Sequence, residues 1–140
     1  GTITDTNTGL MWEKLSANGT IHDYRTPYIW DNAFAVKVAT LNGGGGFAGH
    51  TDWRLPNLTE LESIRNLEDL NPAVSPAFST GCTQGCAVTS CSCTLPGLYW
   101  SSSSYADDAT NAWDVDFGLG NANTFPKALH HYVRAVRGGL

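Results

Sequence analysis

Side chains able to bind a ligand are concentrated in the last third of the sequence, between residues 105 and 130. Carboxylates, amides, a phenol, a lysine and a histidine occur there, and such groups form hydrogen bonds with sugar hydroxyls or with a protein surface. We therefore predict a ligand-binding surface, with an ordinary polar rim as the alternative. The predicted ligand-binding residues are Tyr105, Asp107, Asp108, Asn111, Asp114, Asp116, Asn121, Asn123, Lys127 and His130.

Calcium is a second possible ligand. Ca²⁺ takes roughly six to eight hard oxygen ligands, and neighbouring carboxylates repel one another unless a cation or solvent relieves them. The candidate metal ligands are Asp107, Asp108, Asp114 and Asp116, together with Asp5 and Asn7 of the stretch DTNTG. That stretch resembles the first half of a calcium loop but lacks its distal glutamate. Calcium is thus possible, no cofactor is required, and a solvated acidic edge is the alternative.

The cysteines form one cluster with the spacing Cys-x3-Cys-x4-Cys-x-Cys. Structural zinc sites prefer Cys-x2-4-Cys pairs with a longer spacer between them, and the tight Cys-x-Cys half departs from that pattern. Two disulfides that staple a loop rich in Thr, Ser and Gly are favoured over zinc. The sequence leaves the pairing of Cys82, Cys86, Cys91 and Cys93 open.

Catalytic chemistry has little support. His22, His50, His130 and His131 fall in different predicted elements, and no serine or cysteine has the strand-turn-helix context of a nucleophile. The glycine run at 43–46 follows no predicted strand and precedes no Lys-Ser/Thr pair, which argues against a phosphate-binding loop. We expect a protein that is not an enzyme.

Composition and charge narrow the class of protein. A chain of 140 residues suffices for one domain, and we expect a single domain over residues 1–140. A net charge of −5 would repel a nucleic acid, and no stretch approaches the roughly 20 apolar residues of a membrane span. The charged fraction is only 15%, and aromatic and small polar residues are abundant, which favours a secreted or cell-surface domain.

Periodicity predicts the elements that must position these residues. Alternation at 10–14 predicts a strand after a turn, and helical spacing over 30–42 predicts a helix with one buried stripe. A second helix is predicted over 57–67, where Asn57 and Glu60 have the spacing of a capping box.

The second half of the chain predicts a long loop followed by antiparallel strands. The irregular region covers about 68–98 and contains the cysteine cluster. Strands are predicted over 98–105, 112–117 and 131–137, with a turn-rich tip at 118–124. The predicted fold is α+β, with two helices packed on a small twisted antiparallel sheet and the first strand pairing near the last.

Alternation on the predicted strand at 112–117 separates a buried row from an exposed one. We predict Trp113, Val115 and Phe117 inward, with Ala112, Asp114 and Asp116 outward. Trp53 is expected to fill the joint between the two helices, and Arg54 to tie the connecting backbone to a carboxylate or to carbonyls. The residues predicted to be structural are Trp12, Trp30, Trp53, Arg54 and Trp113.

Several sequence blocks, in the same order, resemble the DUF1566 family, which includes the C-terminal domain of a Legionella collagen-like adhesin. The blocks are TGLMWEK, Trp-x2-Ala, GFAGHTDWRLPNLTELESI, YWSSS and YVRAVRGG. The resemblance implies a C-type lectin-like fold, similar also to the formylglycine-generating enzyme, and a bacterial extracellular location. The cysteine cluster lies in what looks like an inserted loop, so the oxidation chemistry of the sulfatase-activating relatives is not carried over.

These observations favour an extracellular, non-enzymatic binding or adhesion domain whose partner is a glycan or a cell-surface protein. The adhesin relative is thought to bind sulfated polysaccharides through a basic surface, whereas this chain is acidic, which favours a neutral glycan or a protein. The alternative is a structural bead of a homopolymeric fibre assembled head to tail. Glycosylation is possible, because Asn18-Gly-Thr and Asn57-Leu-Thr match the acceptor pattern.

Overall fold

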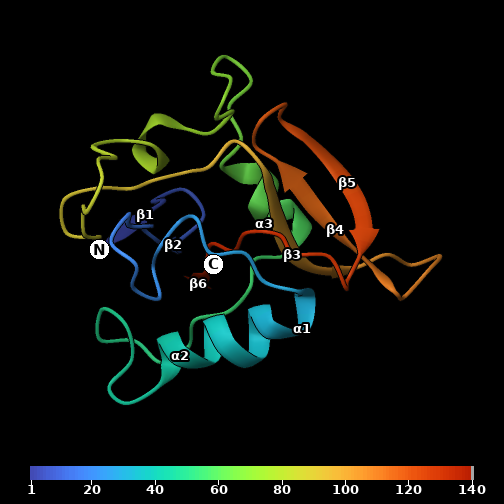
Figure 1. The fold of residues 1–140 in the computed structure, drawn as a ribbon, viewed down its shortest axis with the longest axis horizontal. Coiled ribbons are helices and arrows are strands. Elements are labelled where there is room, and N and C mark those ends of the chain that lie inside the picture. The colour runs from blue at the N-terminus through green and yellow to red at the C-terminus, as the bar shows by residue number, and fades with distance from the viewer. Residues whose placement is uncertain (140) are drawn as a thin grey trace.

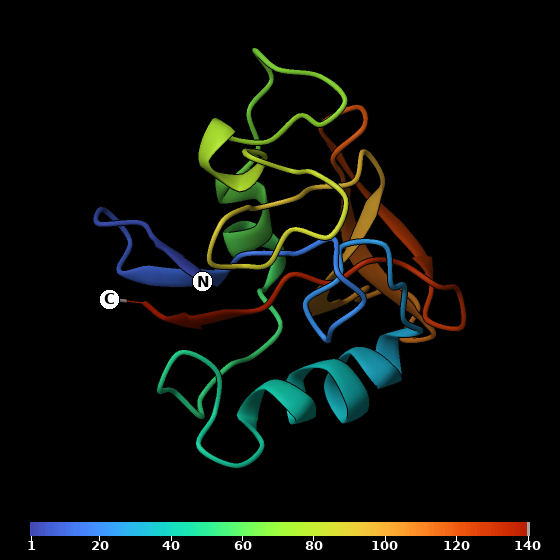
Figure 2. The same cartoon turned by 60° about the vertical axis from the view of Figure 1, so that its left-hand side comes forward.

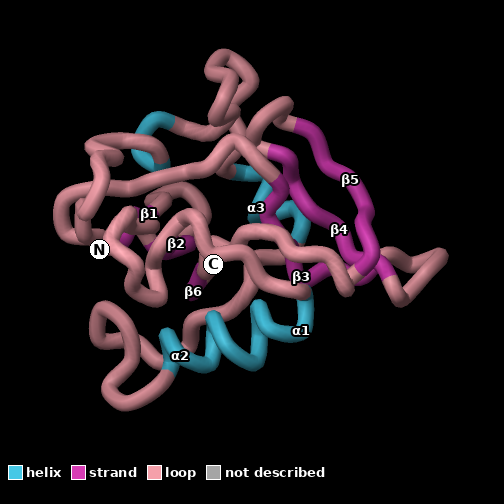
Figure 3. The backbone as a smooth tube through the Cα atoms, viewed as in Figure 1, coloured by secondary structure: helices cyan, strands magenta, loops and turns pink. Residues whose placement is uncertain are grey.

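The computed structural model describes residues 1–139 and places them in a small α+β fold (Figure 1). Its β structure consists of two three-stranded antiparallel sheets, with strand orders β1-β2-β6 and β3-β4-β5. The prediction of one small sheet is therefore wrong, although the α+β class is confirmed. Loops connect short elements throughout (Figure 3).

The first sheet joins the early and late parts of the chain. β1 (Thr2–Thr4) pairs with β2 (Leu10–Glu13), and β2 pairs with β6 (Val136–Gly138). Figure 2 shows these strands side by side. The strand predicted at 10–14 corresponds to β2, and its predicted pairing with the last strand is confirmed. β1 lies in the stretch predicted to be a turn, and β6 is shorter than the predicted 131–137 strand. Residues 131 and 132 instead form bridges with other segments.

The second sheet carries half of the predicted ligand-binding residues. Its strands are β3 (Leu98–Ser104), β4 (Asn111–Asp116) and β5 (Asn121–Pro126). β5 pairs with β4 along its whole length, so the prediction of a turn-rich tip over 118–124 is wrong beyond residue 120. Asn is unusual in strands, and β5 contains two asparagines and a terminal proline, so pairing with β4 overrides this local preference.

Helical structure is confined to short pieces. α1 (Trp30–Asn32), the π-helix η1 (Ala33–Val38) and α2 (Ala39–Asn42) follow one another without a break, within the span predicted to be helical. The 3₁₀ turn η2 (Pro76–Phe78) interrupts the long loop region. The sequence pattern did not predict the π-helical stretch.

α3 (Leu58–Ser63) is shorter than the helix predicted over 57–67. Its beginning follows the prediction, because the side chain of Asn57 accepts from the Glu60 amide while the Glu60 carboxylate accepts from the Asn57 amide. Its end comes earlier because the chain after residue 64 pairs with a later segment. The amide of Asn66 donates to the carbonyl of Ala73 at 3.1 Å.

Both faces of β4 are covered. On one face, Val115 packs with Tyr99 of β3 and with α3 side chains. On the other, Ala112 packs with Trp100 and residues of the α1 to η1 segment. Ala112 and Asp114 are fully buried, so the prediction that they face solvent is wrong. Successive side chains of β4 do point to opposite faces of the sheet, as predicted. Because this central strand is covered on both faces, neither set of side chains faces solvent along the whole strand.

Trp113 also departs from its predicted environment. Val115 and Phe117 are fully buried as predicted, whereas Trp113 on the same side of β4 is only partly buried. The ring lies near the end of the strand that is remote from the Phe117 cluster. Its outer surface contacts Tyr105. The inward prediction for Trp113 is therefore wrong in part, because the core does not extend over the whole strand.

The stretch around Trp53 links the helical segments to both sheets. Trp53 is 2% exposed and packs with Leu41 at the end of α2 and with Ala135. The Arg54 guanidinium makes two parallel bonds of 2.7 Å to the Glu60 carboxylate and also donates to the Gly138 carbonyl at 3.1 Å. Arg54 thus connects the α3 cap to β6, using the fork geometry that Lys lacks.

A buried arginine connects β2 with the disulfide region. Arg134 is 1% exposed. Its Nη1 donates to the carbonyl oxygen of Glu13 at 2.7 Å, and its Nη2 donates to the carbonyl oxygen of Cys93 at 2.6 Å and to Oγ1 of Thr94 at 2.8 Å. Its guanidinium also lies over the ring of Phe78, 5.2 Å from the centroid. These partners offset the cost of burying the charge.

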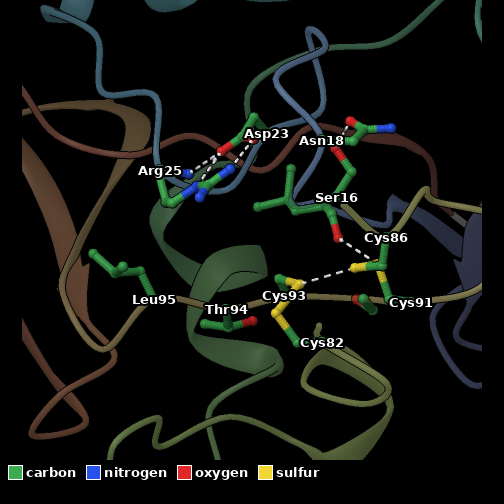
Figure 4. The surroundings of a disulfide bond; sticks show 12 residues. Ser16, Asn18, Asp23, Arg25, Cys82, Cys86, Cys91, Cys93, Thr94 and Leu95 are labelled. Atoms are coloured by element: carbon green, nitrogen blue, oxygen red, sulfur yellow. Dashed lines mark hydrogen bonds and ion pairs between the residues drawn. A yellow bond between two sulfur atoms is a disulfide. The ribbon is translucent and has the colours of Figure 1, made fainter. Parts of the chain in front are cut away.

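The cysteine cluster contains two nested disulfides, Cys82–Cys93 and Cys86–Cys91 (Figure 4). The loop that they close also bonds to the chain after β2, since the Ala17 amide donates to the Cys86 carbonyl at 3.0 Å. All four sulfurs are oxidised in pairs, which corresponds to the disulfide prediction and leaves no thiolate for the zinc alternative.

We predict that Arg134→Met lowers the free energy of unfolding by about 3 kcal/mol, because buried carbonyl oxygens lose their donors. Urea unfolding of the oxidised protein measures the change. The control is Arg137→Met, which removes the exposed ion pair with Asp52 and should cost no more than about 1 kcal/mol. Equal losses in the two variants would contradict a dominant role for Arg134.

Candidate functional site

The predicted ligand-binding residues lie at two ends of the β3-β4-β5 sheet rather than at one. Tyr105, Asp107 and Asp108 lie in the turn between β3 and β4, while Asp116 and Asn121 face each other in register at the opposite end of β4. Five residue steps separate the two ends of β4, which is about 17 Å along a strand. A single small ligand cannot contact both ends.

The first end presents a pair of partly exposed aromatic rings. Tyr105 and Trp113 meet edge to face, with centroids 5.7 Å apart and an interplanar angle of 89°. The Tyr105 hydroxyl donates to Oδ2 of Asp107 at 3.3 Å. Thr124 of β5 is opposite Trp113 in register, which puts its hydroxyl on the same face of the sheet. Apolar ring surface therefore lies beside a carboxylate and a hydroxyl.

A second aromatic contact lies at the same end. The Lys127 ammonium lies 4.0 Å from the ring centroid of Trp30 and donates to Oγ of Ser104 at 2.8 Å. The Trp30 indole nitrogen donates to the Ser101 carbonyl, which fixes the ring against β3. Trp30 is partly exposed and packs with Ala112 and Trp100, on the face of the sheet opposite Trp113. His130, which follows β5 in the sequence, is exposed.

The remaining polar residues of the turn stabilise the turn itself. Oδ1 of Asp108 accepts from the amide and the hydroxyl of Thr110, and these bonds lower the pKa of Asp108. The backbone amide of Tyr105 donates to the carbonyl oxygen of Asn111 at 3.0 Å. Asp107 is exposed. The turn is thus ordered by its own side chains and holds Tyr105 in place.

The opposite end has a similar arrangement without exposed aromatic rings. Oδ1 of Asp116 accepts from the Gly118 amide at 2.7 Å, which closes the turn before β5. Asn123 donates to Asn121 at 3.4 Å. These three side chains lie away from Tyr105 and Trp113. They are not part of the aromatic surface defined by those two residues.

Asp114 is buried rather than part of an exposed acidic row. Its carboxylate is fully buried, and Oδ2 lies 3.2 Å from Nδ1 of His131, but their orientation does not make a hydrogen bond. Trp100 stacks on the His131 ring at 4.0 Å. Burial raises the pKa of Asp114, and the nearby His131 only partly opposes this effect. A buried, poorly paired carboxylate costs stability.

The candidate calcium ligands do not come together. Among residues 1–139, the only group of three acidic, histidine or cysteine side chains with ligand atoms within 4.8 Å of one another is Cys82, Cys86 and Cys93, whose sulfurs are in disulfides. Asp5 lies in the β1-β2 turn, where its carboxylate accepts from the Asn7 amide and the Thr8 hydroxyl. These bonds lower the pKa of Asp5.

Sequence reasoning missed Trp113, Trp30 and Thr124 as surface residues of the first end. Both tryptophans were predicted to be structural, and Thr124 was assigned to a turn. The sequence does contain a signal for the exposure of Trp113, because this residue is the first of its row on the strand and lies close to the preceding turn, where a strand often extends beyond the core. We nevertheless predicted it to be buried, because tryptophan is a large apolar residue.

Fold and site together define a small, disulfide-bonded α+β domain with an aromatic and polar surface at one sheet end. The profile of the Lcl C-terminal domain family matches residues 1–137, and the chain belongs to this family. This finding agrees with the resemblance to the C-terminal domain of the Legionella collagen-like adhesin. A comparison with curated proteins found no match. No helix within residues 1–139 has the length and apolarity to cross a bilayer.

We predict that Asp114→Asn stabilises the protein by about 1 kcal/mol at pH 7, because it removes a buried charge. The raised pKa in the folded state means that wild-type stability falls as the pH rises from 3.8 through that pKa. The advantage of the variant should therefore disappear below pH 3.8. Unfolding curves between pH 3 and 8 test this, with the exposed Asp107→Asn as a control. A destabilised Asp114→Asn protein at pH 7 would refute the prediction.

Proposed function

We propose that this chain is an extracellular, non-enzymatic binding domain that contacts a glycan through the surface formed by Tyr105 and Trp113. The observation that carries the proposal is the partly exposed edge-to-face pair of these rings beside the Asp107 carboxylate. Aromatic rings offer rigid apolar area to the C–H faces of a sugar. The carboxylate and nearby hydroxyls can pair with its hydroxyl groups.

The charge of the chain favours a neutral glycan. The net charge is −5, and the aromatic surface is bordered by Asp107 and Asp108. The nearby cation, Lys127, is already engaged with Trp30 and Ser104. A sulfated or otherwise anionic chain would meet unfavourable charge at this surface. A protein partner with a complementary loop is the other ligand class compatible with these groups.

The extracellular location is supported by the disulfides, which persist in oxidising compartments. It is also supported by membership of a family that includes an adhesin domain. A C-type lectin-like assignment is part of the proposal, and the long disulfide-bonded loop region and small antiparallel sheets support it. We do not include calcium in the proposal, because no three carboxylates within residues 1–139 lie close enough together to share one ion.

The test of this function is glycan binding by purified oxidised protein on an array of neutral and sulfated glycans, followed by titration of the bound species. We expect a neutral glycan to bind and Trp113→Ala to weaken binding about tenfold or more, because the apolar contact is lost. The control is Leu119→Ala, since Leu119 is 70% exposed in the turn at the other sheet end. Equal affinity of the two variants, or exclusive binding of sulfated chains, would overturn the proposal.

A fibre subunit is the second candidate function, and the free edge of β5 favours it. β5 is the outer strand of its sheet and has no charged side chain among its six residues. The ladder with β4 turns the backbone groups of Ala122 and Thr124 outward. Natural edge strands usually carry charges that prevent pairing with another chain. Pairing between copies through this edge would extend the sheet from one subunit to the next.

We predict that, if the fibre function holds, Ala122→Pro abolishes filaments while leaving the monomer folded. Proline at this position removes an outward amide and no bond to β4. Electron microscopy and size exclusion with light scattering distinguish the forms. A wild-type chain that stays monomeric at high concentration excludes this function, and filaments of the variant would exclude the β5 edge.

A further inference from the structure

A glutamate, a histidine and a lysine meet beneath the helical segment formed by α1, η1 and α2. Oε1 of Glu13 accepts from Nζ of Lys37 at 2.6 Å and lies 2.7 Å from Nδ1 of His22. Oε2 of Glu13 accepts from the Ala135 amide at 3.0 Å, and Nζ of Lys37 also donates to the Ile21 carbonyl. Glu13 and Lys37 are buried, whereas the His22 side chain is 14% exposed.

This arrangement fixes which ring nitrogen of His22 carries its proton. Burial on its own raises the pKa of Glu13, but Lys37 and His22 more than offset that effect and lower it, so the carboxylate is ionised. An ionised carboxylate only accepts hydrogen bonds, which requires the proton on Nδ1 of His22. In the neutral form of the ring, Nε2 then carries the free lone pair. It forms no hydrogen bond with any residue in 1–139 and is not sealed from solvent.

His22 lines a surface cavity of about 210 Å³. The ring of Phe47 forms one wall, 4.3 Å from the His22 ring and tilted by 45° to it. Gly46 is required at the rim, because its φ is 76° and a side chain there would overlap the His50 carbonyl. The cavity is lined by Ile21, His22, Thr40, Leu41, Gly43, Gly46 and Phe47. The cavity thus combines a hydrogen-bond acceptor on His22, the aromatic ring of Phe47 and the hydroxyl-bearing residue Thr40.

We infer that this cavity is a second ligand site, which binds a single neutral sugar residue by one of its hydroxyls. The hydroxyl donates to Nε2 of His22, and an apolar face of the sugar ring packs on Phe47. The Glu13 and Lys37 charges neutralise each other, so the cavity does not select an ionic ligand. Its lining residues Thr40 and Leu41 belong to α2. Because α2 lies away from β5 (Figures 1 and 2), the cavity is independent of the Tyr105 and Trp113 surface.

A ligand-binding role of His22 can be separated from a structural role by experiment, because each role uses a different ring nitrogen. Nδ1 serves the fold through Glu13, and Nε2 has no hydrogen-bond partner within residues 1–139. Asparagine in place of His22 can donate to Glu13 from its amide nitrogen, in a position similar to that of Nδ1, but it has no counterpart of Nε2. His22→Asn therefore separates the two roles.

The experiment is nuclear magnetic resonance on the full oxidised chain, labelled with nitrogen-15, during titration with methyl glycosides of glucose, galactose, mannose and N-acetylglucosamine. We expect the free protein to show the Nδ1-protonated form of His22. At least one glycoside should shift Nε2 of His22 and the amides of Gly46 and Phe47. His22→Asn should keep the wild-type unfolding midpoint within a few degrees but lose about tenfold in affinity, as expected for one missing hydrogen bond.

Location of the shifts separates this proposal from the proposed function. Shifts confined to the Trp113 indole and the turn before β4 would leave the aromatic surface as a binding site and overturn the cavity site. Shifts at the cavity alone would support the cavity site and argue against the aromatic surface. Absence of any shift at His22 with all four glycosides, proton placement on Nε2, or unchanged affinity of His22→Asn would each overturn the inference.

Discussion

The Glu13 carboxylate and the Arg134 guanidinium form the polar connection on which the rest of the structure depends. Both side chains are buried, and the Glu13 main chain and side chain bond to residues 134 and 135 together with Lys37. Through these bonds β2, the π-helix η1, the disulfide region and the segment that leads into β6 share one centre. A domain with short elements and few regular helices lacks a large apolar interface, so buried charge-assisted bonds fix the relative positions of its parts.

Two candidate binding surfaces lie outside this buried centre. At the far end of the β3-β4-β5 sheet, the core stops before the end of β4, and Trp113 reaches solvent beside Tyr105. Near α2, the centre itself approaches the surface, since His22 connects the buried Glu13 to a cavity. The first surface exists because the apolar core ends before Trp113. The second exists because the buried polar cluster around Glu13 reaches the protein surface at His22. Both are consequences of a small core.

The local features of the fold could be predicted, and the long-range ones could not. The cap at Asn57, the disulfide preference and the helical span from Trp30 onward depend on neighbours in sequence, whose spacing carries the signal. The division into two sheets and the burial of Asp114 depend on which distant segment covers a strand. Nothing in an alternating pattern distinguishes a strand covered on one face from one covered on both.

The candidate site shows the same limit. Tyr105 and Asp107 lie together because they share one turn, and pairing of the chain after β5 with residue 110 brings Lys127 to the same sheet end. Asp116 and Asn121 were assigned to the same site, but antiparallel pairing puts them at the other end of β4. The role of His22 depends on contacts with Glu13 and Lys37 that are distant in sequence. Single-sequence reasoning has no access to such contacts.

The nested disulfides have a consequence for the durability of the exposed loop. Cys86–Cys91 lies inside the segment closed by Cys82–Cys93. A protease that cuts once between residues 87 and 90 leaves two fragments that stay joined by both crosslinks. The Cys93 end is anchored in turn by Arg134. An extracellular enzyme could therefore nick this loop without releasing any part of the domain.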